Sequence, residues 1–280
     1  MIPKRIIIVA SGYSIRENLW NVSIDKLPIW NAIKDEFKLA CNWSYKWADA
    51  DIMTYSDYQM YETKRENLKN LPIIVGATDG HYFRKETKPI ENNTYLFPAC
   101  KGIKHSKYGT VGGYWDKEGW SKGLYTRQLV GIQAISLAIL LGCTELFLLG
   151  YDACCDEQGR THFYQDDKQT GIYKWNNHEH NGMGKDERGN YRSGNYNKIE
   201  ELNNFWFKPF EKELQNGIQI YNVSLDSKID TFPKISYKEF YKRLKDNLIG
   251  VNHEELQKEI KKTFRMQKLF TRSTKKENVN

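Results

Sequence analysis

Hydrophobic residues in this 280-residue chain gather in seven short runs that are separated by longer, mixed stretches. Continuous apolar runs of this length are typical of strands that are buried on both faces of a parallel sheet. The intervals between most of them leave room for helices. The runs lie at residues 5–10, 37–41, 51–55, 71–76, 95–100, 145–149 and 218–223. This alternation predicts an α/β fold, a Rossmann-like and mostly parallel sheet flanked by helices.

Three stretches between or after these runs have a helical pattern. Residues 126–141 are apolar around most of a helix circumference, and Gly142 supplies a stop at the C-terminal end. We expect this helix to pack under the sheet. Further helices are predicted at 198–215 and 235–248.

Residues 156–197 differ in character from the rest of the chain. They are rich in Gly, Asn and Asp and almost free of aliphatic residues, although they contain several Tyr and one Trp. Such a segment cannot build its own core, and long irregular segments inside compact domains tend to be lids or binding loops. We therefore predict a catalytic domain over residues 1–250 with a lid insertion at 156–197; a disordered insertion is the alternative.

The basic charge of the chain is concentrated in a predicted tail, residues 251–280. The net charge is +7, and residues 258–280 hold eight Lys or Arg against two Glu. The rest is about neutral, which argues against nucleic-acid binding by the folded core. A loose apolar stripe runs through the tail, at Leu256, Ile260, Phe264 and Phe270. The stripe suits contact with an anionic membrane surface or another anionic partner, such as nucleic acid; a solvated C-terminus is the alternative.

The sequence favours a cytoplasmic protein, peripheral at the inner membrane face if the tail binds there. The most apolar stretch, residues 129–141, is shorter than the roughly 20 residues of a membrane-spanning helix. No cleavage site follows the first apolar run. The five cysteines suggest reduced thiols. The oligomeric state is left open, and an oligomer is compatible with the sequence.

Candidate chemistry is expected where the strands end, because open α/β sheets bind ligands at the carboxyl ends of their strands. Ser11, Gly12 and Ser14 follow the first strand and suit a phosphate or ribose, although they form neither a GxGxxG nor a Walker A pattern. Asn42 follows the second strand, and an Asn can read a ribose or base edge. Ser56 and Asp57 follow the third. Taken singly, each of the residues after the second and third strands is more often a turn cap, and it is their convergence on the same edge as Ser11 that favours a binding role.

Two further features concern phosphate and metal. Arg127, at the predicted start of the buried helix, is unfavourable against the helix dipole unless a phosphate or an acidic partner compensates it. Asp49 and Asp51 form an Asp-x-Asp pattern that many nucleotide-sugar transferases use for Mn²⁺ or Mg²⁺. This pair precedes its strand, so we expect no required cofactor and keep the metal as the alternative.

Candidate acids and bases lie after the sixth strand and in the lid. Tyr151 and Asp152 directly follow that strand. His162, His178 and His180 are candidate bases because imidazole titrates near neutral pH. The spacing of His178 and His180 matches no recognised zinc site.

Several of these pieces together resemble the bacterial sialyltransferases that cap lipooligosaccharides, and the wider bacterial and phage group that shares their first domain. The matching features are the loop Ala10–Ile15, the pair Cys41-Asn42, and the block from Arg127 to Asp152 with Gly131 inside it. The order of the motifs is more specific than any one of them. The resemblance covers roughly residues 5–60 and 125–235.

The resemblance implies a nucleotide-binding domain with a lid that transfers a sugar from a nucleotide-sugar donor, CMP-linked in that family, to a glycan or other hydroxyl acceptor without a metal. It implies that Ser11, Gly12 and Ser14 contact the donor, Asn42 its ribose or phosphate region, and Arg127 with Gly131 the phosphate and substrate site. The lid histidine of that family falls near Ser193 here, so the base would be His162, His178 or His180. Ser56 replaces an Asn of the family.

Two other classes remain open at this point. A metal-dependent pyrophosphokinase of the pterin type would use the same phosphate loop with Mg²⁺ at Asp49 and Asp51. A phage-type nucleotide- or nucleic-acid-binding or DNA-modifying protein would use the basic tail as its electrostatic contact.

Overall fold

The computed structural model describes residues 1–55, 71, 73–77, 93–97, 103–105, 109–111, 124–125, 129–154, 156–157, 160, 162–164, 184–185, 191–192, 202–246 and 249–277.

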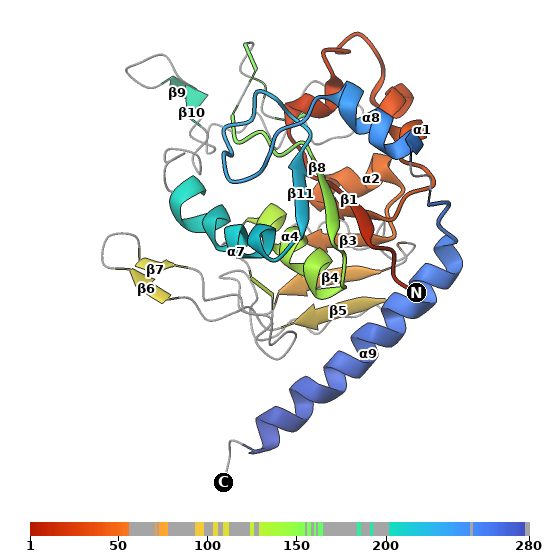
Figure 1. The fold of residues 1–280 in the computed structure, drawn as a ribbon, viewed down its shortest axis with the longest axis vertical. Helices are drawn as coiled ribbons and strands as arrows, with labels where there is room; N and C mark the ends of the chain where they lie inside the picture. The colour runs from red at the N-terminus through yellow and green to blue at the C-terminus, as the bar shows by residue number, and fades with distance from the viewer. Residues whose placement is uncertain are drawn as a thin grey trace.

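The core of the protein is a seven-stranded sheet in which every strand pair is parallel (Figure 1). Its strand order is β11-β8-β1-β2-β3-β4-β5. The strands are β1 (Arg5–Val9), β2 (Lys38–Cys41), β3 (Ile52–Tyr55), β4 (Ile74–Ala77), β5 (Thr94–Phe97), β8 (Glu145–Leu149) and β11 (Gln219–Asn222). All seven predicted strands are present, and the predicted α/β Rossmann-like class is confirmed.

Strand β1 lies inside the sheet and pairs with β8 on one side and β2 on the other. All five of its residues are buried. A strand with helices on both faces has no solvated side, which explains its continuous apolar sequence. The loops that follow β1, β2 and β8 therefore leave the same edge of the sheet next to one another.

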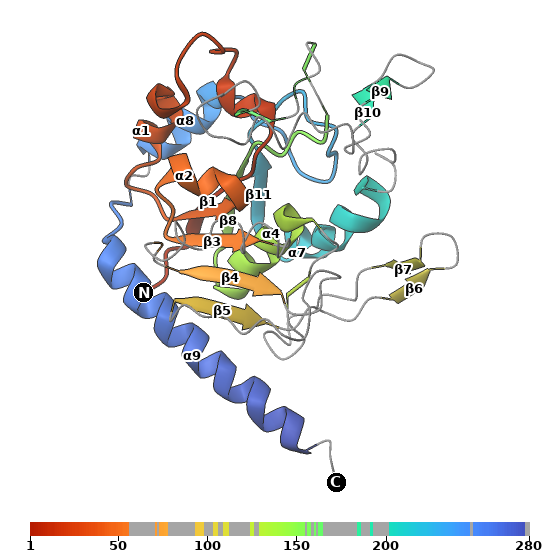
Figure 2. The ribbon, with the colours of Figure 1, turned by 180° about the vertical axis from the view of Figure 1, so that it is seen from behind.

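The helices cover both faces of this sheet (Figures 1 and 2). Helix α4 (Val130–Leu140) packs on one face together with Phe207 and Phe210. Helices α1 (Pro28–Ala32), α2 (Tyr45–Ala48) and α8 (Tyr237–Asp246) supply the apolar side chains on the other face. Helix α4 begins four residues later than position 126, because Leu129 is still extended.

The remaining elements are short. They are the 3₁₀ helices η1 (Tyr13–Arg16), η2 (Ile24–Lys26), η3 (Asn42–Ser44) and η8 (Lys208–Phe210), the π-helix η7 (Leu202–Phe207), helix α7 (Glu211–Gln215), and the antiparallel pairs β6 (Ile103–His105) with β7 (Gly109–Val111) and β9 (Gly184–Lys185) with β10 (Tyr191–Arg192). The helix predicted at 198–215 is thus divided among η7, η8 and α7. Pro209 lacks an N–H donor and stands where the irregular turns lead into α7.

Helix α9 (His253–Glu277) carries the basic tail and starts against the body of the protein (Figure 2). Leu256, Ile260 and Phe264 are buried in the same apolar cluster as the α4 side of the sheet. The ring of Phe264 lies 5.1 Å from that of Tyr95 and 5.3 Å from that of Phe97. These three stripe residues therefore face the protein and not a membrane. Contact of the basic residues with an anionic partner stays a prediction.

Two further sequence expectations can be checked in the described residues. None of their helices is both long enough and apolar enough to cross a membrane. Among the described cysteines, Cys41, Cys143 and Cys154 form no disulfide bond with one another.

Candidate functional site

The loops after β1 and β8 are joined at the carboxyl edge of the sheet. The N–H of Ala10 donates to the carbonyl of Leu149 at 2.8 Å, and the N–H of Gly12 donates to the carbonyl of Gly150 at 3.0 Å. The sheet pairing is thus prolonged past the ends of the strands. This contact places the predicted phosphate loop directly beside Tyr151 and Asp152.

Gly12 is required at this point by the closeness of its neighbours. A Cβ on residue 12 would lie 2.3 Å from Oδ2 of Asp152 and 2.4 Å from the carbonyl oxygen of Gly150. Both distances are shorter than a real Cβ contact, and the second neighbour is backbone. The glycine is therefore explained by a close approach of two loops, which is also what a ligand-binding turn needs.

Asp152 is buried at the centre of this junction. Its Oδ2 accepts a 2.9 Å hydrogen bond from the N–H of Ser14, and its side chain is 2% exposed. Its other oxygen, Oδ1, is buried without a hydrogen-bond partner. Burial raises the pKa of this carboxyl, while the Ser14 hydrogen bond acts in the opposite direction. A buried carboxyl oxygen without a protein partner is costly, and it can accept a hydrogen bond from a ligand or a water molecule.

His162 lies on the other side of the phosphate loop. It forms an antiparallel bridge with Gly12, and the N–H of the following Phe163 donates to the carbonyl of Ser11 at 3.1 Å. Burial lowers the pKa of His162 to about 4, so its imidazole is neutral near pH 7. The structure thus brings one predicted base to the predicted donor loop.

The segment that carries His162 is anchored from both sides. The buried guanidinium of Arg16 donates through Nε to the carbonyl of Phe163 at 2.7 Å. The ring of Phe163 packs edge-on against Trp47 at 5.1 Å, and Tyr164 stacks on the same Trp47 at 5.6 Å. Residues 162–164, inside the predicted lid, are therefore part of the body of the protein.

Tyr151 connects the same loop to helix α4. Its hydroxyl donates to the carbonyl of Gly131 at 2.9 Å, and a Cβ on residue 131 would lie 2.9 Å from the Tyr151 ring. Burial raises the pKa of Tyr151 well above its ordinary value. The hydroxyl is thus committed to a helix carbonyl, so this geometry suits a residue that positions the loop.

Asn42 follows β2 at the same edge, as the sequence predicted. Its backbone is left-handed, with φ of 48°, and its Oδ1 is buried without a hydrogen-bond partner. A left-handed Asn costs some backbone energy, and an unpaired buried oxygen costs more. Both features are compatible with the binding role predicted for Asn42.

Two residues near this edge were missed by the sequence analysis. Ser224 follows β11 and Tyr237 begins α8, and their hydroxyl oxygens are buried without hydrogen-bond partners, like Oγ of Ser14 and Oδ1 of Asp152. Ser224 lies close enough to lower the pKa of Asp152. The pKa of Tyr237 is raised mainly by burial, and the charge of Asp152 is the second cause. No local sequence pattern marks either residue, because their partners are distant in the chain.

The Asp-x-Asp pair lies away from this edge, since it precedes β3. Oδ1 of the buried Asp51 lies 2.7 Å from Nδ1 of His253, and its Oδ2 accepts a 3.0 Å hydrogen bond from the N–H of Lys38. Asp49 is exposed. Within the described ranges no three His, Cys, Asp or Glu side chains form a group that could hold a metal ion. Metal dependence stays an open prediction.

Several predicted site residues lie outside the described residues. These are Ser56, Asp57, Arg127, His178 and His180. Their roles stay predictions.

Comparison with known proteins supports the fold. No protein-family model matches the chain, and no curated protein matches it. The MAf glycosyltransferase from Magnetospirillum magneticum AMB-1 superimposes with a TM-score of 0.51 at 11% identity, over 95% of this chain and 38% of that one. This chain thus spans well under half of that protein.

Two structures of the sialyltransferase CstII from Campylobacter jejuni are also similar. The complex with CMP-3FNeuAc has a TM-score of 0.38 at 14% identity, and the complex with cytidine-5′-monophosphate has a TM-score of 0.41 at 16% identity. Each match covers 84% of this chain and 86% of the other. The match to the MAf glycosyltransferase supports the α/β fold.

Proposed function

We propose that the protein is a glycosyltransferase that moves a sugar from a nucleotide-sugar donor, with CMP as the first candidate nucleotide, to a hydroxyl group of a glycan or other macromolecule. The observation that carries this proposal is the junction of Gly12, Asp152 and His162 at the carboxyl edge of the sheet. Unpartnered buried oxygens of Ser14 and Asn42 lie at the same edge. The glycosyltransferase fold of the structural neighbours agrees with it.

The donor would lie along the loops after β1, β2 and β3. The proposal assigns the loop with Ser11, Gly12 and Ser14 to the donor phosphate, and Asn42 to its ribose or phosphate region. Arg127 and Gly131 would line the phosphate and substrate site, with Ser56 and Asp57 contributing at the next strand. Hydroxyl groups such as those of Ser11 and Ser14 suit phosphate oxygens as hydrogen-bond donors.

The reaction assigned here needs one base and one stabilised leaving group. The acceptor hydroxyl oxygen attacks the anomeric carbon, the bond from that carbon to the phosphate oxygen breaks, and the nucleotide leaves as an anion. A neutral imidazole, His162 or alternatively His180, takes the hydroxyl proton. Arg127 and the loop donors stabilise the negative charge on the departing phosphate. Tyr151 positions the loop, and no metal is required in this scheme.

A thermal-shift panel tests the donor class directly. The purified protein is heated with CMP, UDP, GDP, ADP or CMP-sialic acid, each with Mn²⁺, with Mg²⁺ and with EDTA. A ligand at 100 times its Kd stabilises by about 2.7 kcal/mol, which is readily measured. Stabilisation by a cytidine nucleotide that persists in EDTA is the expected result. Stabilisation only by a purine nucleotide with metal would favour the pyrophosphokinase instead, and no shift with any nucleotide would overturn the donor site.

Two variants separate the candidate bases. His162→Ala and His180→Ala are compared for transfer and for the nucleotide-induced shift. Loss of transfer with an unchanged shift identifies the base, because the proton acceptor does not contribute to nucleotide binding in this scheme. Full transfer by both variants would reject both histidines.

A further inference from the structure

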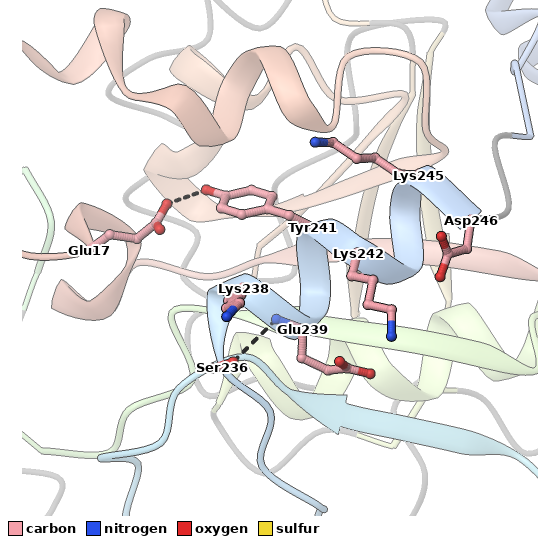
Figure 3. A pocket seen from close by; sticks show the side chains of 8 residues that line it. All are labelled: Glu17, Ser236, Lys238, Glu239, Tyr241, Lys242, Lys245 and Asp246. Carbon is pink, nitrogen blue, oxygen red and sulfur yellow. Dashed lines mark hydrogen bonds between the residues drawn. The ribbon is translucent and has the colours of Figure 1, made fainter.

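An open groove of about 770 Å³ lies between helix α8 and the end of η1 (Figure 3). On one side stands Glu17, whose backbone is left-handed with φ of 47°. On the other side Tyr241 reaches from α8 and donates its hydroxyl proton to the Glu17 carboxyl oxygen Oε1. Figure 3 shows this contact, with lysine side chains of α8 projecting around it. The aromatic ring and the carboxyl therefore form a fixed wall of the groove.

Three lysines line the groove, and they follow one another on α8 at spacings of four and three residues. Lys238, Lys242 and Lys245 span about 10 Å of the α8 axis at roughly 1.5 Å per residue. In the part of the chain that the structure describes, none of the three forms an ion pair. All three are exposed. A row of ammonium groups thus faces solvent along the groove.

Two of the three acidic residues in the lining already have partners. Glu17 accepts the Tyr241 hydrogen bond, and burial raises its pKa. Glu239 forms a 2.9 Å ion pair with Arg243. The third, Asp246, follows Lys245 directly and offsets part of the positive charge of the three lysines. Since Glu239 is paired with Arg243, the lysine charges are only partly balanced within the groove. Ammonium groups, carboxyl oxygens and an aromatic face together are the side chains that hydrogen-bond sugar hydroxyls and cover sugar rings.

The groove adjoins the candidate site through two elements. Tyr237 lies next to Ser236, a groove residue, and its hydroxyl is one of the unpartnered oxygens near Asp152. The rings of Tyr237 and Tyr241 lie 6.0 Å apart. Glu17 follows Ser14 by one turn of η1. A molecule in the groove would thus lie next to the loop that we assign to the donor.

We propose that this groove binds the acceptor, and that the acceptor is an anionic glycan whose carboxylate or phosphate groups pair with Lys238, Lys242 and Lys245. This inference rests on the proposed function and names the acceptor class for it. The Tyr241 ring lies against the sugar, and the lysines fix its direction along α8.

Binding by the full chain tests this assignment without any nucleotide present. Calorimetry is run with a hexagalacturonate, which carries carboxylates, with a phosphorylated mannose oligosaccharide, and with neutral maltohexaose. The two anionic probes distinguish the source of the charge. We expect the better anionic probe to bind about tenfold more tightly than maltohexaose, and less tightly as salt is raised. Equal binding of all three, or of none, overturns the proposal.

Matched variants locate the binding. The triple variant Lys238→Gln, Lys242→Gln, Lys245→Gln is compared with Lys258→Gln, Lys261→Gln, Lys262→Gln on helix α9, which removes the same charge elsewhere. We expect about a tenfold loss of affinity for the first and less than about twofold for the second. Equal losses would indicate general electrostatics and reject the groove.

Two further outcomes are informative. A single-stranded DNA oligomer that binds more tightly than either glycan, and loses its affinity in the α8 variant, would replace the glycan by nucleic acid. If the nucleotide panel fails while the glycan still binds through α8, the donor proposal falls and the groove stands. If nucleotides bind and the glycan does not, only the groove falls.

Discussion

The backbone N–H of Ser14 donates a 2.9 Å hydrogen bond to Oδ2 of Asp152, across a sequence separation of 138 residues. The contact joins the loop after β1 to the loop after β8, and it leaves Oδ1 of Asp152 without a partner. One carboxyl therefore shapes the predicted phosphate loop through Oδ2, while its Oδ1 stays buried without a partner.

Asp152→Asn tests the burial of this carboxyl. Because the folded-state pKa is raised above the unfolded value, folding favours the protonated form, and this stabilisation is lost as the pH rises through the folded pKa. An amide has no such dependence and can still accept from Ser14. The unfolding free energy of the variant relative to wild type should therefore rise from pH 3 to pH 8, by about 1.4 kcal/mol per unit of raised pKa. Urea unfolding at several pH values measures it.

The exposed Asp35→Asn serves as the control for that series, since it alters a carboxyl at the surface. The pH dependence that belongs to the buried carboxyl is the difference between the two series. If the unfolding free energy of Asp152→Asn relative to wild type instead fell as the pH rises, the fold would stabilise the ionised carboxylate.

Gly12→Ala should destabilise the fold because its Cβ would meet Asp152 and the Gly150 carbonyl. We expect a loss of about 3 kcal/mol in urea unfolding, the upper part of the range for overpacking. Gly217→Ala is the comparison, since a Cβ there meets nothing within 4 Å and the cost comes from its φ of +90° alone. That cost should be about 1–2 kcal/mol. A smaller loss at position 12 than at 217 would contradict the close approach.

His162 should titrate far below an ordinary histidine. Its pKa of about 4 means that burial disfavours the imidazolium in the folded state. The wild type should therefore lose stability relative to His162→Gln as the pH falls from about 6.5 toward 4. NMR of the labelled imidazole gives the midpoint directly, and a midpoint near 6.5 would show that the ring is solvated.

Tyr151→Phe should cost about 1–2 kcal/mol because it leaves the Gly131 carbonyl without its donor. Tyr45→Phe is a matched control, since Tyr45 is also buried but its hydroxyl has no hydrogen-bond partner. That variant should be neutral or slightly stabilising. Chemical unfolding of both variants measures the difference, and equal effects would reject the positioning role.

Phe264→Ala should be strongly destabilising, by about 3–5 kcal/mol, because the ring is fully buried between Tyr95 and Phe97. Met266→Ala, two residues on and 49% exposed, should change the unfolding free energy by less than about 0.5 kcal/mol. If both variants changed the unfolding free energy by similarly small amounts, helix α9 would not pack on the sheet in solution.

The strands were predictable because a strand that is buried on both faces carries a continuous apolar run. Even so, their ends moved by one to three residues; β4, for example, begins at Ile74 where the run starts at Leu71. Helix α4 was predicted from its apolar pattern, but it begins at Val130 and not at position 126. Helix propensity does not show that Leu129 has an extended backbone.

Contacts between distant segments were not predictable. The periodicity of Leu256, Ile260 and Phe264 predicts an apolar face but not what covers it, and the structure supplies the sheet as the partner. Ser224 and Tyr237 carry no motif, and only the fold brings them near Asp152. Gly12 and Asp152, by contrast, were identified because they directly follow strands.

The packing of α9 also bears on how the chain folds as it is synthesised. Strand β5 ends at Phe97, whereas the residues that cover its aromatic side chains begin only at Leu256. While the intervening chain is being made, Tyr95 and Phe97 lack this cover, and exposed apolar strands attract chaperones and other chains. Completion of the core should therefore be a late event during translation, and ribosome-bound chains that stop before residue 253 should be the ones that need protection from aggregation.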